Sequence, residues 1–174
     1  ILTDYVPLTK NLAEHQVTHL QMATLPDETT AQGVERITQS AIDSVKQGSR
    51  LIVLDDANAF EQGHGWLDPI LMLSVLDRAL RNSFVELDET ETATPLPVGD
   101  DRKIDLGLTA SRFPQNLRRQ AGIVLRSGAI RNLHDIMLCI GMGADALVPY
   151  MILENSRRAP RSSVTPEARL KNTL

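Results

Sequence analysis

The sequence predicts an α/β fold in which parallel strands are connected by crossover helices. Residues 50–55 (RLIVLD) form an apolar run of strand length with no polar alternation, which is typical of a strand covered on both faces. Residues 120–149 read as a strand, a short helix and a second strand. Such a βαβ unit requires parallel strands and a right-handed crossover. Helical patterns on both sides of residues 50–55 complete an alternation of strands and helices.

The bulk composition suits one globular domain with a real core. The chain has 174 residues, of which 42% are hydrophobic and 23% charged. Its net charge of −4 argues against broad nucleic-acid binding, and no apolar run is long enough to cross a bilayer. The single cysteine, Cys139, cannot form an internal disulfide, so we expect a reducing, cytoplasmic compartment. Because the chain begins at Ile1 without methionine and reads as mid-protein, we also expect a fragment of a longer polypeptide.

The first part of the chain is irregular. Within residues 1–26, only 17–22 alternate, weakly, like an edge strand. His15 and His19 are four residues apart and would share one face of a helix, as metal ligands do. Only Glu14 is near enough to add a third ligand, so surface or packing roles are the favoured interpretation.

The first helix is predicted over residues 28–48. Thr29 or Thr30 is its expected N-cap, and Gly48 ends it. Its apolar stripe consists of Val34, Ile37, Ala41 and Val45. Residues 50–55 then form the covered strand.

A polar loop, residues 56–66, follows at the carboxyl end of that strand, where ligands bind in α/β sheets. The candidate cation ligands there are Asp55, Asp56, Asn58 and Glu61. Their spacing is not that of a calcium loop, so solvated turn residues are favoured over a metal site. Trp66 is expected to be a lid or to lie at a domain interface.

The second helix is predicted over residues 69–81, with Asp68 as N-cap and Pro69 in the first turn. It is apolar on most sides, which predicts a position in a large core or against a neighbouring domain. Residues 83–118 lack clear periodicity and are interpreted as an insertion, with a short strand expected at 104–108. The domain is expected to span 1–154, and 155–174 to form a basic tail or linker.

The helix of the βαβ unit is expected to begin after Asn132, its N-cap, and to end at Gly141 and Gly143 in a left-handed turn. The residues predicted to form its buried face are Leu133, Ile136, Met137 and Ile140. Cys139 lies inside this helix without a glycine-rich elbow, so it is interpreted as a small core residue. We predict no catalytic residue and no metal site.

Free amides beside this helix could cradle a phosphate. The candidate anion-binding residues are Ser127, Gly128, Ala129, Arg131 and Gly143. The stretch resembles the phosphate-binding half of flavin- and phosphate-using (β/α)8 barrels, and the fold is expected to resemble part of such a barrel. Pro149 removes a donor after the second strand, so tight turns without a ligand are the favoured interpretation.

The segment Gly122–Glu154 is similar to part of the glutamate synthase large chain. There a valine- and glycine-rich strand precedes E-S/T-G-E-x-R-E/D-x-H-H and L-x-G-Y-G-A-D-A-I-N-P-Y. The residues that keep this pattern are Ser127-Gly128, Arg131, His134, Gly141, Gly143-Ala144-Asp145-Ala146 and Pro149-Tyr150. The resemblance covers residues 17–154 in order, apart from 83–118. The residues that depart from it are Arg126, Ala129, Asp135 and Val148, so a diverged glutamate synthase-like protein is an alternative parent.

The resemblance implies the central domain, which in this family is α/β, carries no catalytic residue and supports the passage of ammonia. It lies between an amidotransferase domain and a flavin-binding synthase domain. The implied function is a non-catalytic connector in glutamate synthesis from glutamine and 2-oxoglutarate. The implied partners are these neighbouring domains, with a homo-oligomer left open, and neither nucleic acid nor a membrane. No cofactor is expected here, whereas FMN and an iron–sulfur cluster are implied for the parent oxidoreductase.

The sequence is also compatible with two other functions. The chain could be an independent half-barrel that binds FMN or phosphate through the amides near Gly128 and Gly143. It could also be a protein-interaction module that uses residues 56–66 and 83–118. The first alternative predicts stabilisation by a ligand, and the second predicts a stable monomer without one.

Overall fold

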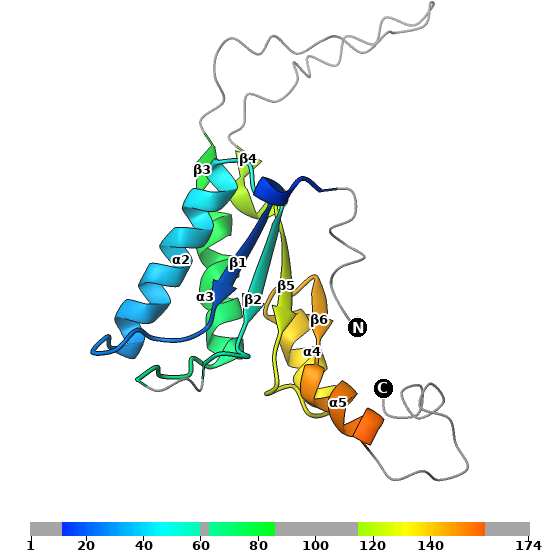
Figure 1. Cartoon of the computed structure of the whole chain (residues 1–174). Coiled ribbons are helices and arrows are strands. Elements are labelled where there is room, and N and C mark those ends of the chain that lie inside the picture. Colours follow the sequence, from blue (N-terminus) through cyan, green and yellow to red (C-terminus); the bar gives the residue numbers. More distant parts are fainter. Residues whose placement is uncertain (1–11, 60–62, 86–114, 159–174) are drawn as a thin grey trace, which may run out of the picture.

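The computed structural model describes residues 12–59, 63–85 and 115–158, and it is an α/β fold (Figure 1). Helices and strands alternate along most of the chain, as predicted. The elements are η1 (Glu14–Gln16), β1 (Val17–Gln21), α2 (Thr30–Lys46), β2 (Leu51–Asp55), α3 (Pro69–Asn82), β3 (Phe84–Val85), β4 (Gln115–Asn116), η2 (Leu117–Arg119), β5 (Gly122–Arg126), α4 (Leu133–Gly141), β6 (Ala146–Val148) and α5 (Tyr150–Arg158).

Four of the described strands form one parallel sheet in the order β1-β2-β5-β6. The spatial order is therefore the order along the chain, and β1 is an edge strand, as predicted for residues 17–22. The βαβ unit is confirmed, because β5 and β6 are parallel neighbours joined by α4. Parallel strands all end at the same edge, so the residues after β2, β5 and β6 meet there.

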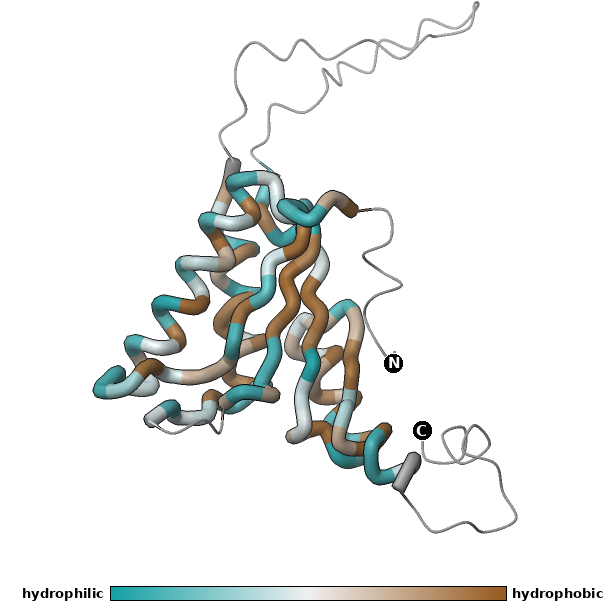
Figure 2. The backbone as a smooth tube through the Cα atoms, in the orientation of Figure 1, coloured by the Kyte–Doolittle hydropathy of each residue, from teal (hydrophilic) through white to brown (hydrophobic). Residues whose placement is uncertain are grey.

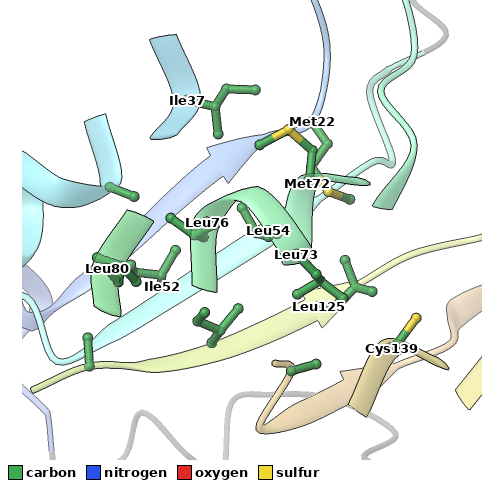
Figure 3. Close-up of a cluster of buried hydrophobic side chains, with 14 of the residues drawn as sticks. Met22, Ile37, Ile52, Leu54, Met72, Leu73, Leu76, Leu80, Leu125 and Cys139 are labelled. Carbon is green, nitrogen blue, oxygen red and sulfur yellow. The ribbon is translucent and has the colours of Figure 1, made fainter. Parts of the chain in front are cut away.

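Strand β2 is covered on both faces, as its unbroken apolar run predicts. Ile52, Val53 and Leu54 are fully buried although their side chains alternate between the two faces. In Figure 2, hydrophobic residues accordingly run along the middle strands. On one face, Ile52 and Leu54 belong to an apolar cluster that includes residues of α2 and α3, and Cys139 of α4 joins this cluster beyond Leu125 (Figure 3). On the other face, Val53 packs with residues of β5 and β6 and with Leu153 of α5.

The predicted helix starts are confirmed by their caps. The Thr29 hydroxyl accepts a hydrogen bond from the Gln32 amide, and the Gln32 side chain accepts one from the Thr29 amide, a reciprocal capping box. Asp68 caps α3 by accepting from two amides, and Asn132 caps α4 by accepting from the Asp135 amide. Side-chain acceptors thus satisfy amides that have no partner within the first turn.

The predicted buried face of α4 is largely wrong. Ile136 is buried as predicted, but Leu133 is 63% exposed, Met137 61% and Ile140 52%. The helix packs on the sheet through Ile136 and Cys139 instead. Because this nine-residue helix is apolar on several sides, periodicity alone could not select its buried face. We call the exposed stripe of Leu133, Met137 and Ile140 the α4 apolar surface.

The domain limits stay a prediction, and the structure describes two elements near them. The outer parts of the segment 83–118 belong to the fold, because β3 pairs antiparallel with β4 and Leu117 is fully buried. Helix α5 continues past the predicted boundary at residue 154. The short strand expected at 104–108 and the far part of the tail, 159–174, lie outside the described residues.

Cys139 is a core residue, as predicted, with 1% exposure. Burial, helped by the charge of Asp135, raises the pKa of its thiol from 9.0 to about 11.

Because the thiolate is the nucleophile, we expect Cys139 to resist a thiol reagent at pH 8 until the chain is unfolded in urea. The pKa of the Cys139 thiol is higher in the folded state than in the unfolded state. The thiol therefore makes its full contribution to stability at pH values below its unfolded-state pKa. That contribution is lost as the pH rises toward 11. Rapid labelling of the native protein at pH 8 would contradict this prediction.

Candidate functional site at the carboxyl edge of the sheet

The polar side chains at the carboxyl edge come from three neighbouring strands. Asp55 ends β2 and Asp56 follows it, Arg126 ends β5 and Ser127 follows it, and Tyr150 begins α5 just after β6. The register places Asp55 directly beside Arg126, and Arg126 beside the last residue of β6. The sheet therefore brings together side chains that are as much as 94 residues apart in the sequence.

Asp56 is the centre of this edge and is only 1% exposed. Its Oδ2 accepts a hydrogen bond from the Ser127 hydroxyl at 2.6 Å. Its Oδ1 accepts one from the Gly128 amide at 3.0 Å and one from the Tyr150 hydroxyl at 2.9 Å. A buried carboxylate is costly unless it is hydrogen-bonded, and these three donors offset that cost.

Asp55 and Arg126 form a second pair on the same edge. Nη1 of Arg126 donates to both carboxylate oxygens of Asp55 at 2.8 Å. The Arg126 guanidinium carbon also lies 4.7 Å from the centroid of the Tyr150 ring, within the range of a cation–π interaction. Tyr150 is thus held by Arg126 through its ring and by Asp56 through its hydroxyl.

Burial and the hydrogen bond to Asp56 raise the pKa of Tyr150 from 10.0 to about 12. The phenol therefore stays protonated at neutral pH and acts as a donor to Asp56. This arrangement does not favour acid–base chemistry, which needs a pKa near the working pH.

The prediction that Asp55 and Asp56 are solvated turn residues is wrong. Both carboxylates turn inward, because β5 and α5 supply the donors that they accept from. Asn58 is exposed in the turn, as predicted, and Glu61 lies outside the described residues. The sequence does contain a signal for these contacts. Two aspartates lie at the end of β2, and the sequence Arg-Ser-Gly lies at the end of the neighbouring strand β5.

The structure brings only part of the predicted anion site together. Ser127, Gly128 and Ala129 lie side by side, and the Ala129 amide donates to the Ser127 hydroxyl oxygen at 3.1 Å. The Arg131 amide donates to the Asp135 carboxylate at 2.8 Å. Gly143 precedes β6, so it lies at the opposite, amino edge of the sheet, where its amide donates to the Ile140 carbonyl.

The Gly128 amide already donates a hydrogen bond to the Asp56 carboxylate of the same chain. A phosphate bound at the Gly128 amide would either displace the Asp56 carboxylate or lie close to its negative charge, which is unfavourable. Phosphate or FMN binding at Ser127–Arg131 stays a prediction that no ligand tests, and its expected geometry now excludes Gly143.

A second polar cluster, at the amino edge, was not predicted. Arg118 donates through Nε to Asp77 at 2.7 Å and through Nη2 to Asp145 at 2.9 Å. It also donates to the carbonyls of Ala121 at 2.9 Å and Gly143 at 2.8 Å. Burial opposes ionisation of Asp77, but hydrogen bonds from Arg81 and Arg118 outweigh it and lower the pKa of that carboxyl.

This cluster explains two residues of the Gly143-Ala144-Asp145-Ala146 motif. Asp145 accepts from the Ile123 amide at 2.7 Å as well as from Arg118. Gly143 has φ +110°, and a Cβ there would lie 2.7 Å from Asp77. The motif therefore acts structurally, where α3, η2 and β6 meet.

Across residues 12–59, 63–85 and 115–158, no three side chains of His, Cys, Asp or Glu are placed to hold a metal ion. His15 and His19 lie in different elements, η1 and β1, so they do not share a helix face. No helix in the described part of the chain is long and apolar enough to cross a membrane.

The fold and the site place the chain in the class of parallel α/β domains. At the carboxyl edge of its sheet, the polar side chains bond largely to one another. A model of the glutamate synthase central domain family matches residues 3–90 and 107–173, which is most of the sequence. The chain belongs to the glutamate synthase central domain family. The internal unmatched residues, 91–106, fall inside the predicted insertion 83–118. No curated protein matches the chain.

Proposed function

We propose that this chain is the non-catalytic connector of a glutamate synthase and keeps the amidotransferase and synthase domains in register. In this role it helps to enclose the path of ammonia during glutamate synthesis from glutamine and 2-oxoglutarate. FMN and an iron–sulfur cluster would belong to the neighbouring parts of the parent protein. This chain carries one cysteine, which cannot by itself supply the cysteine ligands of such a cluster.

The observation that carries the proposal is the hydrogen bonding among side chains at the carboxyl edge of the sheet. This is the edge where α/β proteins usually bind ligands. There the carboxylates of Asp55 and Asp56 accept hydrogen bonds from Arg126, Ser127 and Tyr150. Side chains that satisfy one another rigidify a fold and leave few groups directed at a substrate. This supports a structural role for the edge.

The α4 apolar surface supports contact with another domain. Leu133, Met137 and Ile140 are spaced by four and three residues, so they lie on one side of the helix. All three are more than half exposed. Contiguous exposed apolar side chains are typical of interaction surfaces.

The test is a variant of the full-length protein with Leu133→Gln, Met137→Gln and Ile140→Gln. We expect glutaminase activity and ammonia-dependent glutamate synthesis to stay near wild type. Glutamine-dependent synthesis should fall about tenfold, because loss of buried interface residues loosens the register between two active sites. The three activities are measured on the same preparation.

Leu25→Gln is the matched control, because Leu25 is 47% exposed but lies on the loop between β1 and α2. This control should leave all three activities unchanged. Unchanged glutamine-dependent synthesis in the triple variant would remove the support that α4 gives to the proposal. Saturable FMN binding by the purified chain, with a raised Tm, would instead favour the half-barrel.

A further inference from the structure

One buried carboxylate joins β2 to the last described helix. Asp56 accepts from Ser127 and Gly128, which follow β5, and from Tyr150, the first residue of α5. The first two bonds tie strand ends within the sheet. Only the third, from the Tyr150 hydroxyl, links this carboxylate to α5.

The surroundings of Tyr150 direct its hydroxyl at Asp56. The Arg126 guanidinium lies 4.7 Å from its ring centroid, and Asp55 fixes that guanidinium from the neighbouring strand. Gly128 has no side chain where the phenol passes. A Cβ there would lie 2.7 Å from the Tyr150 oxygen and 2.8 Å from Met151.

Helix α5 depends on such contacts because it is short. It has nine residues, and isolated helices of that length are marginal in water. Its side chains that pack inward are Ile152, Leu153 and Ser156. Figure 1 shows α5 beyond the arrowheads of β5 and β6, at the rim of the sheet.

We propose that Asp56 is a latch that holds α5 on the carboxyl edge, and that loss of the Tyr150–Asp56 bond makes α5 open from the sheet as one unit more often. The helix opens as a unit because a single turn of it would not be stable alone. The sheet stays closed because Ser127 and Gly128 still donate to Asp56.

Hydrogen exchange of the full-length protein tests the latch. Tyr150→Phe removes the hydroxyl and keeps the ring beside Arg126. Peptides of α5 should then exchange about five- to tenfold faster, which is the effect of one net hydrogen bond on a local opening. Peptides of β2 and β5 should change by less than about twofold.

Ser127→Ala is the matched control, because it removes another bond to the same carboxylate but none from α5. It should leave exchange of α5 within about twofold of wild type. The latch would be overturned by unchanged exchange of α5 in Tyr150→Phe, by equal acceleration in β2 and β5, or by a Ser127→Ala variant that opens α5 as much. Exchange of α5 is read separately from coupled activity, so failure of the latch differs from failure of the connector proposal.

Discussion

The Arg118→Ala variant is expected to lose about 3 kcal/mol of unfolding free energy, because it removes the Arg118 donors from two carbonyls and from the partly buried Asp77 carboxylate, which keeps its bond from the exposed Arg81. The Arg118 side chain is 13% exposed and that of Asp77 15%. Arg118 donates to four groups in three different places: Asp77 in α3, Ala121 just before β5, and Gly143 and Asp145 in the turn before β6. Its loss therefore weakens contacts among separate elements at once.

Urea denaturation measures this change, provided that the slope with denaturant stays constant. Arg81→Ala is the control, since Arg81 donates to the same Asp77 but its side chain is 60% exposed. Exposed ion pairs contribute little, so its loss should be much smaller. Arg118→Lys should fall between the two, because lysine keeps the charge but cannot reproduce the planar fork. Equal losses in Arg118→Ala and Arg81→Ala would show that the other acceptors of Arg118 contribute nothing.

Much of the fold was predictable because its signals are local. The caps at Thr29, Asp68 and Asn132 depend on a few neighbouring residues. Asp68 and Asn132 were predicted as caps, and Thr29 was one of two candidates with Thr30. The covered strand β2 was also recognised, because a strand buried on both faces leaves an unbroken apolar run. Local rules fail for α4, where apolar residues on several sides leave the buried face to be decided by tertiary packing.

The candidate site was less predictable, because its geometry depends on strand register. Asp56 and Tyr150 are 94 residues apart in the sequence and meet only when β2, β5 and β6 are aligned. Without that alignment, an aspartate after a strand is indistinguishable from a solvated turn residue. Arg118 was missed for a related reason, since it follows a long aperiodic segment and its partners lie in other elements.

The family pattern at Gly143 and Asp145 describes architecture in this chain. Both residues lie at the amino edge, opposite the edge where Asp56 and Tyr150 meet. Their partners Asp77 and Arg118 come from parts of the chain that the motif does not include. These motif residues thus contact structural partners at the amino edge, and the two edges of one sheet can be tested separately.

Gly143→Ala is expected to lose about 3 kcal/mol of unfolding free energy, from two separate causes. The residue has φ +110°, a conformation that costs residues other than glycine about 1–2 kcal/mol. The new Cβ would also lie 2.7 Å from three atoms of the Asp77 side chain, so α3 or the turn must shift. That shift would also disturb the Gly143 carbonyl that accepts from Arg118.

Gly48→Ala separates these causes. Gly48 has φ +103°, but nothing lies within 4 Å of the position of its Cβ, so only the backbone cost of about 1–2 kcal/mol applies. Urea denaturation of both variants should therefore rank Gly143→Ala as the more damaging by about 1–2 kcal/mol. Equal losses would mean that Asp77 moves aside freely. In that case the Arg118 cluster would be more pliable than its hydrogen bonds imply, and the loss expected for Arg118→Ala would have to be lowered as well.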